Sequence, residues 1–93
     1  MYQLNYSSRF KKDLKRIKKQ SAQNFLLLLN IVQLLEFGGI SQITKKHKPH
    51  PLTGNYKYYF DIHVLPDLLL IFKEDKNNKI IYLTRAGSHS ELF

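Results

Sequence analysis

The sequence predicts an α+β protein in which an antiparallel-rich sheet of four strands carries two helices on one face, in the order β-α-α-β-β-β. Three observations lead to this fold. A short alternating segment opens the chain, two stretches with helical periodicity follow it, and the second half alternates apolar and polar residues between turn signals. Because 93 residues support one modest core, we expect a single domain over residues 1–93.

The first half of the chain predicts one strand and two helices. Alternation over 2–6 indicates a strand, and apolar residues at i, i+4 and i+7 over 10–17 indicate a basic amphipathic helix capped by one of the two serines before it. A second helix is predicted from about Ser21 to the glycines 38–39. It is so apolar that either the first helix and the sheet enclose it, or part of its surface is kept for a partner.

The second half predicts a loop followed by three strands. Two prolines and a glycine indicate a loop over residues 40–54 that ends in a turn. Alternation from residue 55 to 63 and further strand patterns over 68–73 and 79–85 then indicate an antiparallel meander.

Within the strand predicted from Asn55, side chains separate into two faces by parity. Asp61 and His63 share a face, so they project together. The opposite face is predicted to carry Tyr56, Tyr58, Phe60 and Ile62.

Composition excludes several classes of protein. With no cysteine, the chain has no disulfide, thiolate ligand or cysteine nucleophile, which suits a reducing cytoplasm. The longest apolar stretches, Phe25–Leu29 and Leu68–Phe72, are far shorter than the roughly 20 residues that span a bilayer. The N-terminus has no secretory h-region. We therefore expect a soluble cytoplasmic protein without a membrane partner.

Positive charge is concentrated in the first half of the chain. Residues 1–52 hold ten basic and two acidic side chains (10 − 2 = +8), whereas residues 53–93 hold five of each (5 − 5 = 0). Such a surface attracts polyanions, so RNA, DNA and an acidic protein all fit as partners, and a solvated helix face is the plain alternative. The candidate RNA-binding residues are Lys11, Lys12, Lys15, Arg16, Lys18, Lys19, Lys45, Lys46 and Lys48.

Three polar clusters in the second half offer the groups of general acid–base chemistry. They lie in H-P-L-T-G, in D-I-H-V-L-P-D and in the terminal R-A-G-S-H-S-E-L-F. Histidine exchanges protons near neutral pH, and arginine offers a fixed cation to a phosphodiester. The candidate catalytic residues are His50, Asp61, His63, Asp67, Arg85, His89 and Phe93. His47, among lysines, is expected to be an exposed loop residue.

A metal site is the natural rival, because histidine and aspartate are also metal ligands. The chain has no H-E-x-x-H motif, no cysteine and no cluster of several carboxylates as in magnesium nucleases, so we expect no metal or other cofactor. A metal-dependent hydrolase and a non-catalytic basic nucleic-acid-binding module stay open as alternatives. The second would have no use for three histidines on one face.

The three elements H-P-L-x-G, D-x-H-x-x-P-D and R-x-G-x-H-x-x-L-F, in this order and spacing, resemble the YafQ branch of the RelE-type toxins of bacterial type II toxin–antitoxin systems. The resemblance covers the whole chain. It implies a RelE-like fold and a ribosome-dependent endoribonuclease that cleaves mRNA. It also implies an antitoxin that holds the toxin inactive. The expected partners are this antitoxin, the ribosome with its mRNA, and operator DNA only through the antitoxin complex, with the free toxin a monomer.

The resemblance and the chemistry together suggest roles for the candidates. Metal-free RNA cleavage needs a base for the 2′-hydroxyl, an acid for the leaving 5′-oxygen and a cation for the phosphate. We assign the base side to His50 and His63, the acid side to His89, the phosphate contact to Arg85 and base stacking to Phe93. The two aspartates of the D-x-H-x-x-P-D element would orient a histidine, tune its pKa or contact RNA.

One position departs from the family pattern. Many relatives place arginine immediately before the aspartate of the D-x-H element, where this chain has Phe60. Parity points Phe60 away from the face of Asp61, so we expect its effect on the core or on partner contacts.

Overall fold

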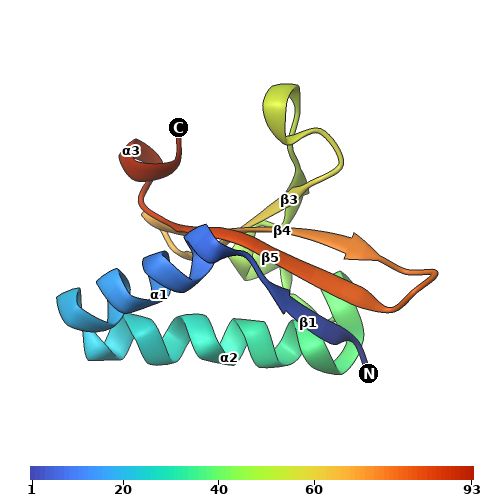
Figure 1. The fold of residues 1–93 in the computed structure, drawn as a ribbon, viewed down its shortest axis with the longest axis horizontal. Coiled ribbons are helices and arrows are strands. Elements are labelled where there is room, and N and C mark those ends of the chain that lie inside the picture. Colours follow the sequence, from blue (N-terminus) through green and yellow to red (C-terminus); the bar gives the residue numbers. More distant parts are fainter.

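The computed structural model describes residues 1–93 as a five-stranded sheet with two long helices against one face (Figure 1). The strand order is β1-β5-β4-β3-β2. β1 (Gln3–Tyr6) runs parallel to β5 (Ile80–Gly87). The other neighbours, β4 (Leu68–Asp75), β3 (Phe60–Leu65) and β2 (His50–Pro51), pair antiparallel. The fold class is confirmed, with one strand more than predicted.

The additional strand, β2, lies in the segment predicted to be a loop. His50 pairs with Asp61 and Pro51 pairs with Phe60 at the edge of the sheet. A proline has no N–H for a second neighbour, so an edge is where a strand tolerates it. A strand of two residues, one of them a proline, is too short to show alternation, which is why the sequence pattern did not reveal it.

Both long helices begin at serines, the first at one of the two predicted cap residues and the second beside the predicted start at Ser21. α1 (Ser8–Gln20) is capped by Ser7 and α2 (Ala22–Gly38) by Ser21. Each serine hydroxyl accepts a hydrogen bond from the backbone N–H three residues further on, at 3.0 and 3.1 Å. The caps satisfy N–H groups that have no partner within the helix, and so define where each helix starts.

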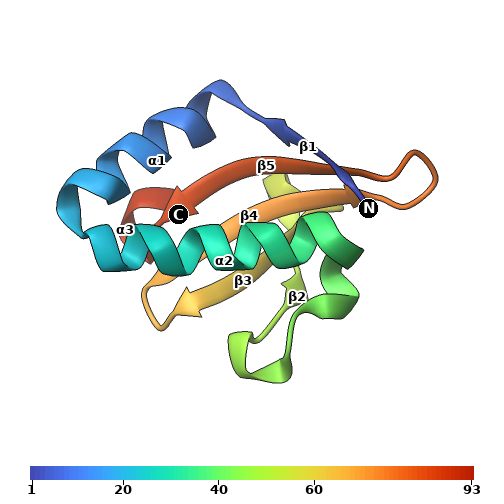
Figure 2. The same cartoon turned by 90° about the horizontal axis from the view of Figure 1, so that it is seen from below.

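The main core lies between the helices and the sheet, as Figure 2 shows from the helix side, where α2 crosses beneath the strands. α1 contributes Phe10 and Ile17, both almost fully buried. The remaining core includes Leu28, Ile31, Val32 and Leu35 of α2 and Ile62, Val64, Leu68, Leu70, Phe72, Ile81 and Leu83 of the sheet. Because side chains alternate along a strand, the residues next to these core positions face the opposite side of the sheet.

Helix α2 is only partly enclosed. By length and composition alone, the segment Ala22–Gln42 is apolar enough to cross a membrane, a test that the core helices of soluble proteins also pass. Its buried residues, among them Leu28 and Leu35, pack in the core. The outer side leaves Leu26 and Phe37 exposed by 61% and 65%. The first helix and the sheet therefore enclose one side of α2, and part of its apolar surface faces solvent.

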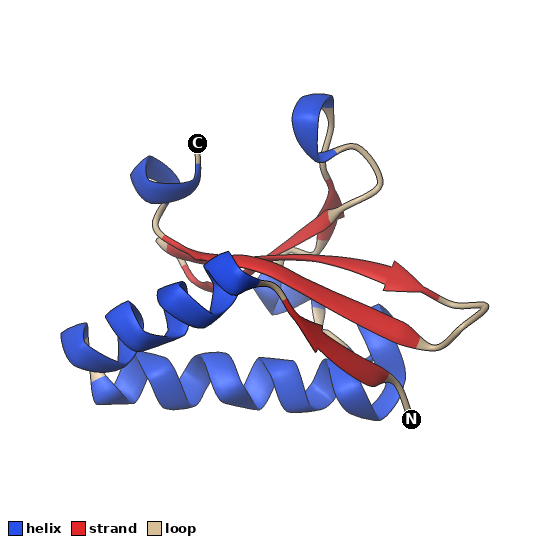
Figure 3. Ribbon diagram, viewed as in Figure 1, coloured by secondary structure: helices blue, strands red, loops and turns tan.

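Strand β3 begins at Phe60, and the prediction of a strand from Asn55 was wrong. Gly54–Tyr56 form a 3-10 turn, visible at the tip of the loop in Figure 3, and Tyr58 has a left-handed φ of 76°. This turn breaks the alternation. Tyr56 consequently lies on the face predicted for Asp61, against Tyr59.

The C-terminal end of the chain is folded and anchored on the sheet. It forms α3 (His89–Leu92), with reciprocal capping hydrogen bonds between Ser88 and Glu91. Leu92 is 7% exposed and packs with Leu69 on the sheet face opposite α1 and α2. This packing fixes the end of the chain beside the open face.

Candidate active site

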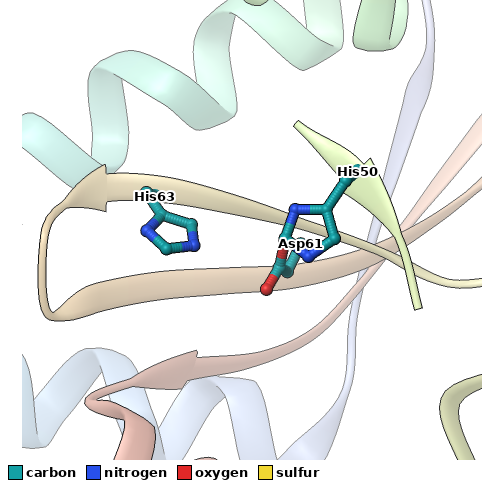
Figure 4. A group of neighbouring side chains, drawn as sticks. All are labelled: His50, Asp61 and His63. Carbon is teal, nitrogen blue, oxygen red and sulfur yellow. The ribbon is translucent and has the colours of Figure 1, made fainter. Parts of the chain in front are cut away.

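The side chains predicted to carry chemistry gather on the sheet face opposite α1 and α2. On β3, Ile62 and Val64 point into the core, so Asp61 and His63 point away from it. His50 reaches the same face from the neighbouring edge strand (Figure 4). The short strand β2 thus places His50 next to β3, the strand that carries His63.

Three imidazoles form a row on this face. The ring centroids of His50 and His63 are 6.1 Å apart, and those of His63 and His89 are 5.7 Å apart. His63 occupies the middle and is half-buried, while both outer rings are exposed to solvent. Groups from β2, β3 and α3 therefore meet, although they are distant in sequence.

Asp61 lies under His50 with a side chain that is almost fully buried. Its Oδ1 is 2.9 Å from His50 Nδ1, but the same nitrogen is 3.0 Å from the carbonyl oxygen of Lys48 and is aligned to donate there. Asp61 Oδ1 therefore makes a close electrostatic contact with the His50 ring but accepts no aligned hydrogen bond. Burial raises the pKa of Asp61, and the positive charges of His50, His63 and His89 partly offset this rise.

Asp67 holds His89 at the other end of the row. It accepts hydrogen bonds from the His89 backbone N–H at 2.9 Å and from the ring Nδ1 at 2.7 Å. These bonds favour the carboxylate and lower the pKa of Asp67. Because Nδ1 donates to Asp67, Nε2 of His89 is the nitrogen that faces solvent.

Arg85 is held by a buried aspartate that the sequence reading missed. Asp13 is 2% exposed and accepts from Arg85 Nε at 2.8 Å, Arg85 Nη2 at 3.3 Å and the Ala86 N–H at 2.9 Å. Burial alone would raise the pKa of Asp13, but hydrogen bonds from Arg85, Ala86 and Arg16 outweigh it and lower that pKa. The Asp13 hydrogen bond in turn raises the pKa of Arg85.

A signal for Asp13 was present in the sequence. It lies three residues after Phe10 and four before Ile17, which places a single carboxylate on the apolar face of a lysine-rich helix. Such a residue needs a buried cationic or N–H partner.

An aromatic cluster lies beside the arginine. The rings of Tyr56 and Phe93 meet edge to face with centroids 6.0 Å apart, and Tyr56 meets Tyr59 in the same way at 6.0 Å. Tyr56 is also close enough to Arg85 to contribute to its raised pKa. Phe93 stays 63% exposed at the chain end. Tyr56 was not among the predicted site residues, because the strand prediction placed it on the other face.

The basic residues divide into separate groups. Lys46 and Lys48 line a groove of about 380 Å³ together with His47 and His63. His47 is half-buried, with Nδ1 2.8 Å from the His63 carbonyl oxygen, so its predicted exposed position was wrong.

Helix α1 carries the other basic side chains. Lys11, Lys15 and Lys18 line a different groove, with Leu14 and Phe25 between α1 and α2. Lys12 and Arg16 lie near Arg85. Lys19 is exposed near the end of the helix, and Lys45 is exposed in the loop before β2.

Arg16 is engaged within the protein itself. Its guanidinium contacts Asp13 Oδ1 at 2.8 Å, the Ala86 carbonyl oxygen at 2.9 Å and Glu91 Oε2 at 3.0 Å. Arg16 thus links α1 to both β5 and α3.

Phe60 points into the helix side of the sheet, as parity predicted. Its ring stacks on Phe72 with centroids 5.8 Å apart and packs against the main core. The residue that replaces an arginine common in relatives therefore contributes packing and leaves the face of Asp61 untouched.

The comparison with known proteins gives the class. A family model described as the bacterial toxin of type II toxin–antitoxin systems, YafQ, matches residues 2–93. The mRNA interferase toxin YafQ of Escherichia coli K12 is 34% identical, over 97% of this chain and 94% of that protein. This chain belongs to the YafQ family of type II toxins, which confirms the resemblance.

Solved structures agree with this assignment. The E. coli DinJ–YafQ complex contains a chain with a TM-score of 0.85 and 33% identity, covering 100% of this chain and 99% of that one. A metal-bound toxin from Helicobacter pylori has a TM-score of 0.83 and 37% identity, with 100% of both chains covered.

Proposed function

We propose that this chain cleaves mRNA on the ribosome by metal-independent acid–base catalysis and thereby stops translation. The observation that carries the proposal is the row of His50, His63 and His89 on one open face. A relative with 34% identity is named an mRNA interferase, which supports RNA as the substrate. A binding module alone would need charge but no row of imidazoles.

The reaction needs two proton transfers and one charge stabilisation. A base takes the proton of the 2′-hydroxyl, the 2′-oxygen forms a bond to phosphorus, and the bond from phosphorus to the 5′-oxygen breaks. An acid gives its proton to that 5′-oxygen. The products are a 2′,3′-cyclic phosphate and a 5′-hydroxyl.

The two ends of the histidine row suit these two transfers. On the base side are His50 and His63, with the buried Asp61 carboxylate 2.9 Å from His50 Nδ1 to stabilise the imidazolium that forms. On the acid side, Asp67 fixes Nδ1 of His89 and leaves Nε2 to donate to the leaving oxygen.

Arg85 is the group for the phosphate. A guanidinium has five N–H donors, and Asp13 takes one from Nε and one from Nη2. We assign the remaining N–H donors of Arg85 to the charge that develops on the phosphate oxygens. Asp13 is then a positioning residue, because it holds the cation without touching substrate.

Binding of RNA falls to aromatic and basic groups around the row. Phe93, supported by Tyr56, offers an exposed ring for stacking on a base. Lys45, Lys46 and Lys48 lie in the segment beside His63 and attract the phosphate backbone.

The test is cleavage of a translated mRNA compared with the same transcript lacking a start codon, with product ends identified by labelling. We expect discrete cuts in the translated transcript alone, cyclic phosphate and 5′-hydroxyl ends, and no effect of EDTA. Equal cutting of both transcripts would contradict ribosome dependence. Ends carrying 5′-phosphate, with loss of activity in EDTA, would contradict the histidine mechanism and favour the metal-dependent alternative.

The partner that restrains this activity is a cognate antitoxin. The DinJ–YafQ complex of E. coli supports a direct protein complex. We propose that the antitoxin presents acidic residues to this basic chain, covers the open face or displaces α3, and brings the toxin to operator DNA only as a complex. An inhibitory complex that left both the histidine row and α3 free would contradict this arrangement.

The site of action follows from the substrate. Because translated mRNA is found in the cytoplasm, we propose that the toxin acts there and that it is a monomer when free of the antitoxin. We further propose that residues 1–93 act as one domain, since the main core joins Tyr2 at one end to Ala86 near the other.

A further inference from the structure

We propose that Arg16 and Glu91 are positioning residues, which hold the general acid His89 at a fixed place relative to the phosphate-binding Arg85. The inference rests on the proposed acid–base function, because it assigns both residues a part in the same reaction. It gives Arg16 a part different from the direct RNA contact predicted for its basic side chain.

Four side chains of alternating charge form a continuous chain near the end of β5. Arg85 Nε lies 2.8 Å from Asp13 Oδ2, and Arg16 Nη1 lies 2.8 Å from Asp13 Oδ1. Arg16 Nε then lies 3.0 Å from Glu91 Oε2, as an ion pair without an aligned hydrogen bond. One end of this chain is the cation for the phosphate, and the other lies in α3, the helix that His89 opens.

Arg16 connects two helices that lie on opposite sides of the sheet. Figure 1 shows α1 and α3 separated in this way, with β5 between them. The Arg16 side chain crosses near the end of β5, where Nη2 donates to the Ala86 carbonyl oxygen at 2.9 Å. Gly87 leaves the room for this crossing, because a Cβ there would lie 2.8 Å from both Arg16 Nη2 and Glu91 Oε1.

Helix α3 depends on such outside contacts. It has four residues, too few to be stable as an isolated helix. The Glu91 carboxylate serves it twice, since Oε1 accepts from the Ser88 N–H at 2.8 Å and Oε2 faces Arg16. Loss of the Arg16 contact would therefore let α3 shift, and His89 would shift with it relative to Arg85.

The surroundings of Arg16 argue against a direct RNA contact. All three of its nitrogens face partners within the protein, and two of those partners, Asp13 and Glu91, are carboxylates that offset its charge. The side chain is 31% exposed. An arginine engaged in this way adds little to the attraction of phosphate, which makes positioning its better use.

Single-turnover cleavage on programmed ribosomes separates the two roles. At saturating toxin, we expect Arg16→Gln and Glu91→Gln to cleave about tenfold more slowly, with little change in association, because a small misplacement of a reacting group slows the chemical step. Glu91→Gln is the sharper variant, since glutamine can still accept from Ser88 but cannot pair with Arg16. By charge alone, loss of this carboxylate should instead strengthen RNA association and leave the chemical step unchanged.

The matched control is Arg9→Gln. Arg9 is an exposed residue of α1 that lines the same cavity as Arg16 and makes no ion pair with Glu91. We expect this variant to cleave at the normal rate at saturation, and circular dichroism verifies that all three variants are folded. A normal rate at saturation for both Arg16→Gln and Glu91→Gln would overturn the inference. Weakened association of Arg16→Gln alone would then return it to the RNA-binding residues.

Hydrogen exchange follows the position of α3 without any cleavage assay. The Leu92 and Phe93 amides donate to the carbonyl oxygens of Ser88 and His89, at 3.1 and 2.9 Å. We expect both amides to exchange faster when either partner of the ion pair is replaced by glutamine, and at the normal rate in the control. Unchanged exchange in the two ion-pair variants would overturn the inference.

The two proposals fail in distinguishable ways. A chain that never cleaves mRNA, yet loses protection of α3 in both ion-pair variants, would retain the anchoring of α3 and overturn the proposed function. A chain that cleaves mRNA equally well with and without the ion pair would retain the function and overturn the positioning role.

Discussion

One carboxylate oxygen of Asp67 accepts two hydrogen bonds from His89, one from the backbone N–H at 2.9 Å and one from ring Nδ1 at 2.7 Å. Asp67 lies in the turn between β3 and β4, and His89 opens α3. The contact joins residues 22 apart in sequence and sets both the position of the helix and the direction of the ring. The acid side of the site therefore depends on a turn residue.

We expect this contact to loosen only in acid. Hydrogen bonds from the backbone and ring of His89 lower the pKa of Asp67 below its ordinary 3.8. Because the folded-state pKa is depressed, the stabilisation is present above the ordinary value and is lost as pH falls through the folded-state value. Hydrogen exchange of the His89 amide, followed as pH is lowered, measures the loss of this stabilisation. Asp67→Asn should remove this dependence, and an unchanged profile in that variant would contradict the assignment.

His89→Ala should abolish cleavage with little effect on folding, because the ring is exposed. Loss of a general acid costs about 10²–10⁴-fold in rate. The measurement is single-turnover cleavage on programmed ribosomes at saturating toxin, where binding defects vanish and chemical defects remain. Ser90→Ala in the same helix is the control and should cleave like the unmodified protein. Normal turnover by His89→Ala would remove it from the catalytic set.

Two pairs of lysines should differ in their effect on ribosome association. Lys45→Ala with Lys46→Ala removes charge beside the histidine face, whereas Lys11→Ala with Lys15→Ala removes the same charge from α1. Phosphate contacts release counterions, so we expect the first pair to weaken association and lower its salt dependence more than the second. Binding measured over a series of salt concentrations decides this. A larger loss from the α1 pair would place the RNA path along that helix.

Asp13→Asn should destabilise the protein by about 3 kcal/mol, since it leaves the largely buried Arg85 guanidinium without its carboxylate. The depressed pKa of Asp13 predicts stability that is present above its ordinary value of 3.8 and is lost as pH falls through the folded-state value. Urea unfolding as a function of pH measures both effects. Glu36→Gln removes one negative charge from a partly exposed position and should change stability by less than about 0.5 kcal/mol.

Phe93→Ala should weaken the productive binding of mRNA through loss of stacking, by about 1–3 kcal/mol. Phe93→Tyr keeps the ring and should keep activity. The matched control is Phe37→Ala, because Phe37 on α2 is similarly exposed, 65% against 63%, and lies on the helix side of the sheet. Cleavage at subsaturating toxin compares them. If both alanine variants lost cleavage activity equally, Phe93 would have no specific role in mRNA binding.

Local patterns were sufficient for the helices and the meander. The two helix starts, at one of the serines 7 and 8 and near Ser21, could be predicted because a serine cap satisfies N–H groups within three residues of itself. Strand parity correctly predicted that Asp61 and His63 share one face of the sheet. The same rule correctly predicted that Phe60 lies on the opposite face. These features depend only on neighbours along the chain.

The sequence alone therefore determined the family, the fold class and a set of candidate residues, because periodicity, capping and motif spacing are local properties. Only the tertiary structure decided that Asp13 meets Arg85 across 72 residues, that His50 belongs to an edge strand and that Tyr56 joins Phe93. Pairings of this kind depend on strand register, turn geometry and burial. No periodic pattern records them, since a buried carboxylate is specified by the cation that the folded chain brings to it.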